Sequence, residues 1–176
     1  KSDEVYDRLT AWAYEFDTQF YNLLTADPEF SRKMLAIDRD EAKKPRKDIA
    51  KWSDAKDYFA YFFGSLYTPC HTLPENIEAQ DAKAFLTEYK KVYDAADDRQ
   101  AWFDKIKSVA PSLGFAAETK EYKANPDAFK GSAGDLSTVL RIAVTGRTNT
   151  PDLCSIMAVL GKDECFKRID KMIEVL

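Results

Sequence analysis

The stretch from Arg39 to Lys51 carries residue types that could bind the phosphates of a nucleic acid. It holds six Lys or Arg residues against three acidic residues, in a chain that is acidic as a whole. Basic side chains neutralise backbone phosphates and release the counterions condensed on them. Phosphate contacts are predicted for Lys43, Lys44 and Lys47. The alternative interpretation of this stretch is an ordinary solvated loop.

A second candidate is the segment 141–153, which reads RIAVTGRTNTPDL. Arg141 lies off the apolar stripe of its predicted helix, so we expect its side chain to point outward. Arg147 falls in a turn, and Thr150 is predicted to begin a helix whose unpaired N–H groups favour anions. Arg side chains can stack on an unpaired base or hydrogen-bond its edge, which is how proteins read single-stranded RNA loops. The alternative is a helix–turn–helix corner without a ligand.

The sequence shows no pattern typical of a catalytic or metal site. Its one histidine, His71, directly follows Cys70, while Cys154 and Cys165 are distant in sequence. Neither Cys-x-x-Cys nor His-x-x-x-His spacing occurs, and there is no Gly-rich phosphate loop and no Gly-x-Ser-x-Gly turn. We therefore predict no catalytic residue and no metal site in this chain. The few cysteines without paired spacing favour a reducing compartment, which predicts a cytoplasmic protein.

The composition is that of a globular protein that does not enter membranes. Of the 176 residues, 45% are hydrophobic and 32% are charged. No apolar run approaches the roughly 20 residues that span a bilayer. The net charge of −4 argues against a generally basic nucleic-acid binder, so a nucleic-acid contact must come from a local patch. The sequence begins at Lys1 without a starting Met, which suggests a segment of a longer protein.

Apolar residues recur three or four positions apart along almost the whole chain, which predicts helices. The predicted helices are residues 3–25, a short helix after Asp27-Pro28, and residues 54–66, 76–95, 98–113, 135–145, 150–160 and about 162–176. Gly114, Gly146 and Gly161 are expected to end three of these helices. Residues 115–134 are expected to be irregular.

The fold class predicted from these patterns is all-α, because the alternation typical of strands is absent. Two prolines and little periodicity mark residues 68–74 as a linker. The sequence therefore predicts two consecutive helical subdomains, residues 1–72 and 73–176.

The last third of the chain resembles the C-terminal end of bacterial glutamate–tRNA ligases. The resemblance rests on segments 141–146 (RIAVTG), 151–153 (PDL), 160–163 (LGKD) and 168–169 (RI), which follow one another in the family's order and spacing. Upstream, FKGSAGDLSTVLR (129–141) fits the preceding segment, and KKPRKDIAKWSD (43–54) resembles a version seen in some members. The family's nucleotide-site signatures, of the His-Ile-Gly-His and Lys-Met-Ser-Lys-Ser kinds, are absent from these residues.

The resemblance implies the two helical subdomains of a class I glutamyl-tRNA synthetase that bind the anticodon arm. The Rossmann catalytic domain, with its ATP and Mg, would lie outside this chain, and this chain would need no cofactor. The implied partner is tRNA(Glu), and tRNA(Gln) is left open as a second. We expect no DNA partner, no membrane contact and a monomer.

The family's contacts to anticodon bases fall on Arg141, Thr150 and Leu153 of this chain. For the last anticodon base, the nearest match is Arg46. Together with the basic stretch, further phosphate contacts are expected from Arg147, Lys167, Arg168 and Lys171.

The alternative function is an all-α module that binds another protein through aromatic residues. The obvious aromatic cluster runs from Tyr58 to Phe63, and we interpret it as part of the protein's own core. Salt-dependent binding to tRNA would separate the two functions, because an apolar interface depends far less on salt.

Overall fold

The computed structural model describes all residues from Lys1 to Leu176 and is all-α, which confirms the predicted fold class. The chain divides into two compact units, Lys1–Thr68 and Pro69–Leu176. The division lies four residues before the boundary placed at residue 72 from the linker composition. None of the helices combines the length and the apolar character that crossing a membrane requires.

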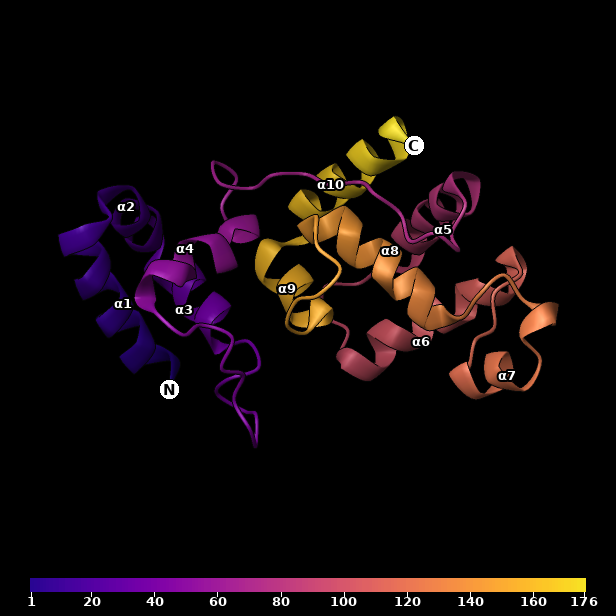
Figure 1. Cartoon of the computed structure of the whole chain (residues 1–176), viewed down its shortest axis with the longest axis horizontal. Helices are drawn as coiled ribbons and strands as arrows, with labels where there is room; N and C mark the ends of the chain where they lie inside the picture. Colours follow the sequence, from indigo (N-terminus) through magenta and orange to yellow (C-terminus); the bar gives the residue numbers. More distant parts are fainter. The chain divides into compact units, whose positions relative to one another are not determined.

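The first unit holds α1 (Ser2–Phe16), α2 (Thr18–Ala26), α3 (Pro28–Ala36) and the short α4 (Ala55–Tyr58). Helix α1 packs on α2 and α3 (Figure 1). The single helix predicted for residues 3–25 is wrong, because Asp17 interrupts it. Its extended backbone ends α1, and its carboxylate accepts a hydrogen bond of 3.0 Å from the Phe20 N–H to begin α2. Asp27 begins α3 in the same way.

The helix predicted for residues 54–66 is mostly replaced by short turns. Only α4 is α-helical, and single 3-10 turns, Trp52–Asp54 and Ala60–Phe62, flank it. The consecutive side chains Tyr61, Phe62 and Phe63 are all buried. A regular α-helix would spread three consecutive side chains over about 200° of its surface, so all three could not face the core. The irregular backbone of this segment allows all three to be buried. The cluster from Tyr58 to Phe63 thus supplies core, as predicted.

The second unit holds α5 (Ala79–Val92), α6 (Arg99–Val109), α7 (Thr119–Ala124), α8 (Ala133–Thr145), α9 (Leu153–Leu160) and α10 (Lys162–Val175). Helix α8 packs against α5, α6 and α10, and Figure 1 shows it crossing the middle of this unit. Eight of its thirteen residues are buried, so it forms the centre of the core. The elements that carry the candidate corner are therefore attached to the best-packed helix of the unit.

The segment that leads into α8 is more ordered than expected. Residues 115–134 were predicted to be irregular, yet they contain α7 and a 3-10 turn, Pro126–Ala128. Ala116 bonds to the backbone of Gly131 (2.9 Å) and of Ala133 (2.8 Å). The expected helix start at Asp135 is also wrong. Ser132 caps α8, and Asp135, three residues on, accepts a bond from the Ser132 N–H.

Candidate nucleic-acid interface

The corner between α8 and α9 is a seven-residue turn, residues 146–152, with a glycine at its start. Gly146 adopts the left-handed conformation (φ 71°) and ends α8, as the sequence predicts. The Thr145 hydroxyl accepts a hydrogen bond of 3.1 Å from the Arg147 N–H. This bond holds Arg147 close to the end of α8. The next helix begins later than predicted. Its cap is Asp152, not Thr150, because the Asp152 carboxylate accepts the N–H of Ser155 at 2.9 Å.

The prediction that the Arg141 side chain points outward into solvent is wrong. Its guanidinium Nη1 donates to the Thr150 hydroxyl and to the carbonyl oxygens of Thr150 (3.3 Å) and Pro151 (2.8 Å). The side chain is half-buried. Its position off the apolar stripe was read correctly, but the long side chain reaches across the turn and bonds to peptide oxygens that no helix satisfies. Arg141 therefore holds the shape of the corner.

Thr150 and Leu153 are also located inside the corner. Thr150 is 8% exposed, and its hydroxyl donates to the Pro151 carbonyl at 2.8 Å while it accepts from Arg141. Leu153 is 1% exposed and belongs to the core. Both side chains are therefore buried in this structure, whereas the resemblance implies that they contact a base. They build the turn from within.

A groove of about 580 Å³ opens beside this turn. One wall is the extended segment from Cys70 to Pro74, and the other is the end of α8 with the turn that follows it. Its lining residues are Cys70, Thr72, Leu73, Pro74, Ile142, Gly146, Arg147, Thr148 and Asn149. The groove therefore combines an apolar surface with a guanidinium, a carboxamide and two hydroxyls. Those are the groups that stack on a base and hydrogen-bond its edge.

The sequence missed the groove because its two walls are far apart in the chain. Thr148 and Asn149 carry no signal of their own in the sequence, and the segment 69–74 is part of the predicted linker. The prolines at both ends of that segment were the available signal, since they favour the extended backbone that forms a wall. Arg147 was expected to bind phosphate, and the structure places it in the groove itself.

Cys70 and His71 do not form a nucleophilic pair. Cys70 is exposed. Hydrogen bonds with Thr72, the larger effect from its backbone and the smaller from its side chain, lower the pKa of the thiol. Burial and the nearby charge of Lys171 lower the pKa of His71 below its ordinary value of 6.5, so the ring is neutral at pH 7. No hydrogen bond joins the two side chains. The structure also brings no three His, Cys, Asp or Glu residues together in a group that could bind a metal ion.

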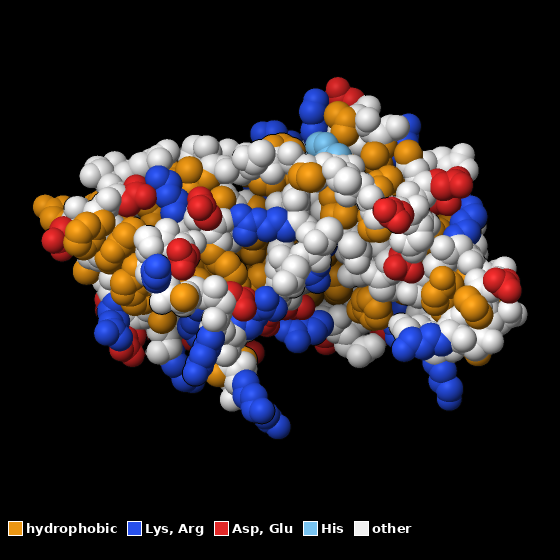
Figure 2. Space-filling view, viewed as in Figure 1, with side chains coloured by type: hydrophobic (Ala, Val, Ile, Leu, Met, Phe, Trp, Pro, Cys, Tyr) orange, Lys and Arg blue, Asp and Glu red, His pale blue; other side chains and the backbone are white.

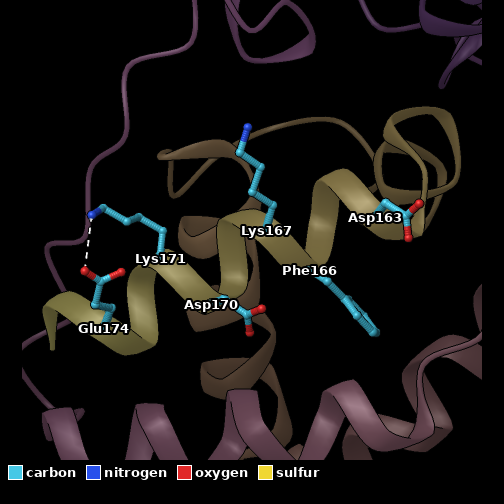
Figure 3. Close-up of a pocket in the computed structure, with 6 residues that line it drawn as sticks. All are labelled: Asp163, Phe166, Lys167, Asp170, Lys171 and Glu174. Atoms are coloured by element: carbon cyan, nitrogen blue, oxygen red, sulfur yellow. Dashed lines mark ion pairs between the residues drawn. The ribbon is translucent and has the colours of Figure 1, made fainter.

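The three basic residues expected on α10 have three different environments. Lys167 is exposed, makes no ion pair and points away from the helix, whereas Asp170 leaves it on the opposite side (Figure 3). The Lys171 ammonium lies 3.6 Å from the Glu174 carboxylate, with both side chains exposed. Arg168, which is also predicted to bind phosphate, is 5% exposed in this structure, and its guanidinium bonds to Glu164 and to the Val144 carbonyl. A shallow groove of about 570 Å³ lies along this face of α10, and its lining residues are Asp163, Phe166, Lys167, Asp170, Lys171 and Glu174.

The basic stretch of the first unit forms the irregular loop between α3 and the turn at Trp52. Lys43, Lys44 and Lys47 are exposed and form no ion pair within the chain. Lys and Arg side chains project where this loop extends below α3 (Figures 1 and 2). Ser2 anchors the loop, because its N–H donates to the Asp40 carboxylate at 2.8 Å. The loop therefore presents exposed lysine ammonium groups on a backbone that is held to the start of α1.

Arg46 is held at the side of this loop. Its Nε donates to the Asp48 carboxylate, which also accepts a bond of 2.7 Å from the Tyr58 hydroxyl. That hydroxyl and the guanidinium lower the pKa of Asp48, while burial and Asp48 raise the pKa of Tyr58 to about 12. Arg46 is thus oriented by an ionised carboxylate, at a distance along the chain from the α8–α9 corner.

Comparison with known proteins gives one consistent family. The model of a family described as anticodon binding domain matches residues 4–173. A glutamate–tRNA ligase from Clostridium beijerinckii is 38% identical over 180 residues, covering 99% of this chain and 32% of that protein. Glutamate–tRNA ligases from Acetivibrio thermocellus and Sorangium cellulosum are 37% and 38% identical over 98% of this chain. The chain spans about a third of the length of these curated relatives. The match along nearly its whole length shows that the chain belongs to the anticodon-binding domain family.

Proposed function

We propose that this chain binds the anticodon arm of a tRNA, as one part of a longer glutamate–tRNA ligase. The observation that carries the proposal is the groove beside the α8–α9 corner, in a chain that belongs to the anticodon-binding domain family. Relatives named glutamate–tRNA ligase align with almost all of this chain. The expected partner is tRNA(Glu), with tRNA(Gln) as the second candidate. ATP and Mg would act in the part of the ligase outside this chain, which would work in the cytoplasm as a monomer.

Within this proposal the residue roles differ from those expected from the sequence. Arg147 and Asn149 contact an unpaired base in the groove, because both line it. Arg141, Thr150 and Leu153 give the corner its shape from within, since their polar or apolar groups are engaged there. Lys43, Lys44, Lys47 and Lys167 are exposed and contact phosphates; Lys171 does so less strongly, because Glu174 competes for it.

Arg46 keeps its proposed role at the last anticodon base. Its bond to Asp48 fixes the direction of the guanidinium and leaves the side chain partly accessible. A guanidinium that is already oriented loses less side-chain freedom when it binds a base.

The alternative function, a module that binds another protein, loses the aromatic cluster on which it depended. Phe59, Tyr61, Phe62 and Phe63 are buried in the first unit. They are not available as a binding face for a partner helix.

Arg147→Ala in the 176-residue chain tests the proposal. Affinity for an RNA stem-loop that carries a glutamate anticodon should fall by about 1–3 kcal/mol, the cost of losing one specific arginine contact to a base. Fluorescence anisotropy of the labelled stem-loop measures it. Arg8→Ala is the matched control, because Arg8 is an exposed arginine on α1 of the other unit and should leave the affinity unchanged. Equal affinities of all three proteins would contradict the proposed site.

A further inference from the structure

Arg168 is a buried arginine whose charge is directed at the end of another helix. It lies on α10, and 5% of it is exposed. Its Nη1 donates a bond of 2.7 Å to the Val144 carbonyl oxygen, and its Nε donates a bond of 3.0 Å to the Glu164 carboxylate one turn earlier on α10. A guanidinium in this position cannot reach a phosphate in solvent. Its function must be carried through the groups that it touches.

The Val144 carbonyl belongs to the last turn of α8, where carbonyl groups have no partner within the helix. The end of a helix also carries a partial negative charge, which a cation stabilises. Arg168 supplies both a donor and a positive charge at this point. Val144 lies two residues before Gly146 and three before Arg147, the residue that lines the groove. Arg168 therefore fixes the backbone from which the turn departs.

Two other arginines bond to the same corner, and their burial shows which contact matters most. The Arg99 guanidinium lies 3.1 Å from the Asp152 carboxylate at the start of α9, but the Arg99 side chain is 68% exposed. An ion pair so exposed contributes little. Arg141 bonds to Pro151 within the turn itself. Of the three, Arg168 is the arginine whose buried side chain joins the corner to another helix, α10.

We propose that Arg168 is a positioning residue for RNA recognition: by holding the end of α8 against α10, it places Arg147 and the groove wall where an unpaired base can bind. The inference rests on the proposed function and extends it to a residue that does not contact RNA. Loss of Arg168 would leave the Val144 carbonyl and the Glu164 carboxylate without their buried donor. The turn would then lose the fixed geometry on which discrimination between bases depends.

Arg168→Met tests this proposal, because methionine keeps an apolar stem and removes both hydrogen bonds and the charge. Two stem-loops are titrated, one with the glutamate anticodon and one with a substituted base in the anticodon. The wild-type preference for the first should shrink roughly two- to thirtyfold, the range for residues that act through others. The slope of log K against log[salt] should stay unchanged, because no phosphate contact is lost. A milder variant, Arg168→Lys, keeps the charge without the forked donors and should reduce the preference less.

Phe115→Leu serves as the structural control, because Phe115 is fully buried near the other end of α8. It should lower the melting temperature and leave the base preference intact. Arg147→Ala combined with Arg168→Met should lose less than the two single losses together, since both act at one site.

Three results would overturn the inference. A salt slope reduced by about 0.7–0.9 in Arg168→Met would show a direct phosphate contact. An unchanged base preference in both Arg168 variants would show a residue that acts on stability alone. If the wild-type chain bound neither stem-loop, the proposed function itself would be wrong, and this inference with it. That failure is seen in the wild type alone, so it can be told apart from a failure of the Arg168 inference, which is seen only in the variants.

Discussion

Asp17 shows how one carboxylate sets the geometry of the first unit. It ends α1 and caps α2, and its carboxylate lies 3.1 Å from the ammonium of Lys56 on α4. The Phe20 N–H, followed by the hydrogen bond and charge of Lys56, lowers the pKa of Asp17 below its ordinary value of 3.8. The folded protein therefore favours the ionised carboxylate, which links stability to pH.

Asp17→Ala should destabilise the first unit by about 1 kcal/mol near neutral pH, the usual cost of removing a helix N-cap. Because the folded pKa lies below the unfolded pKa, the contribution of Asp17 is complete above pH 3.8 and is lost as the pH falls below it. The difference in unfolding free energy between the variant and the wild type should therefore shrink in acid. Urea unfolding of both proteins, once near neutral pH and once below pH 3.8, measures this difference. Asp17→Asn, which keeps a cap without a charge, should show a smaller loss, and an equal difference at both pH values would count against the assignment.

At the scale of single residues, the sequence predicted the chemical types at the corner better than their roles. Arg141 and Arg168 are predicted to contact RNA, yet in the structure each donates inward to a peptide carbonyl. An arginine side chain is about as long as one helical turn. Its guanidinium can therefore reach the ends of neighbouring helices, and its partner depends on where those helices end. Periodicity gives the direction of the Cα–Cβ bond and says nothing of the end of the side chain. Arg147 differs from both, because it lies in the turn and lines the groove.

The start of α8 shows how two nearby glycines, Gly131 just before the helix and Gly134 in its first turn, can have opposite requirements. A Cβ added to Gly131 would lie 2.6 Å from the Asp135 carboxylate and 3.2 Å from the Phe115 ring. That carboxylate completes the capping box with Ser132, so it cannot move without loss of the cap. Gly134 lies in the first turn of the helix, and the nearest atom to its added Cβ, the Ser132 hydroxyl oxygen, is at an ordinary 3.5 Å.

Gly131→Ala and Gly134→Ala should therefore change stability in opposite directions. The first should cost about 1–3 kcal/mol, because an extra methyl group in a filled space forces its neighbours to shift. The second should stabilise the chain by about 0.5 kcal/mol, because alanine loses less backbone freedom on folding than glycine. The midpoints of urea unfolding give both values under the same conditions. A Gly131→Ala variant as stable as the wild type would show that the capping box tolerates displacement.

Helix ends marked by glycine were predicted well, and helix starts were not. Gly114, Gly146 and Gly161 end their elements as expected, because a positive φ suits glycine and stops a helix. The predicted helix starts were wrong where two possible capping residues lie close together in the sequence. Ser132 and Asp135, or Thr150 and Asp152, are equally suitable by type. Packing of the first turn chooses between them, and that information lies in other parts of the chain.

At the scale of the whole molecule, charge has to be considered locally. The chain has a net charge of −4, yet Lys43, Lys44 and Lys47 lie in one exposed loop without an acidic partner. Elsewhere, acidic and basic side chains are mixed over the face shown in Figure 2. At physiological salt, charges more than about 8 Å apart are largely screened, so a bound phosphate responds to the nearest cations and hardly to the net charge.

The triple variant Lys43→Ala, Lys44→Ala, Lys47→Ala separates these local and global effects. If the loop contacts the single-stranded part of the RNA, each lost contact should reduce the slope of log K against log[salt] by about 0.7, or about 2 for all three. The control replaces Lys83, Lys120 and Lys123, which are exposed lysines of the second unit, and changes the net charge by the same amount. Its slope should match the wild type, because those lysines lie outside the proposed interface. Anisotropy titrations of the anticodon stem-loop over a range of salt concentrations give both slopes. If the two triple variants gave the same slope, the loop would act only through total charge, and the phosphate contacts proposed for it would be wrong.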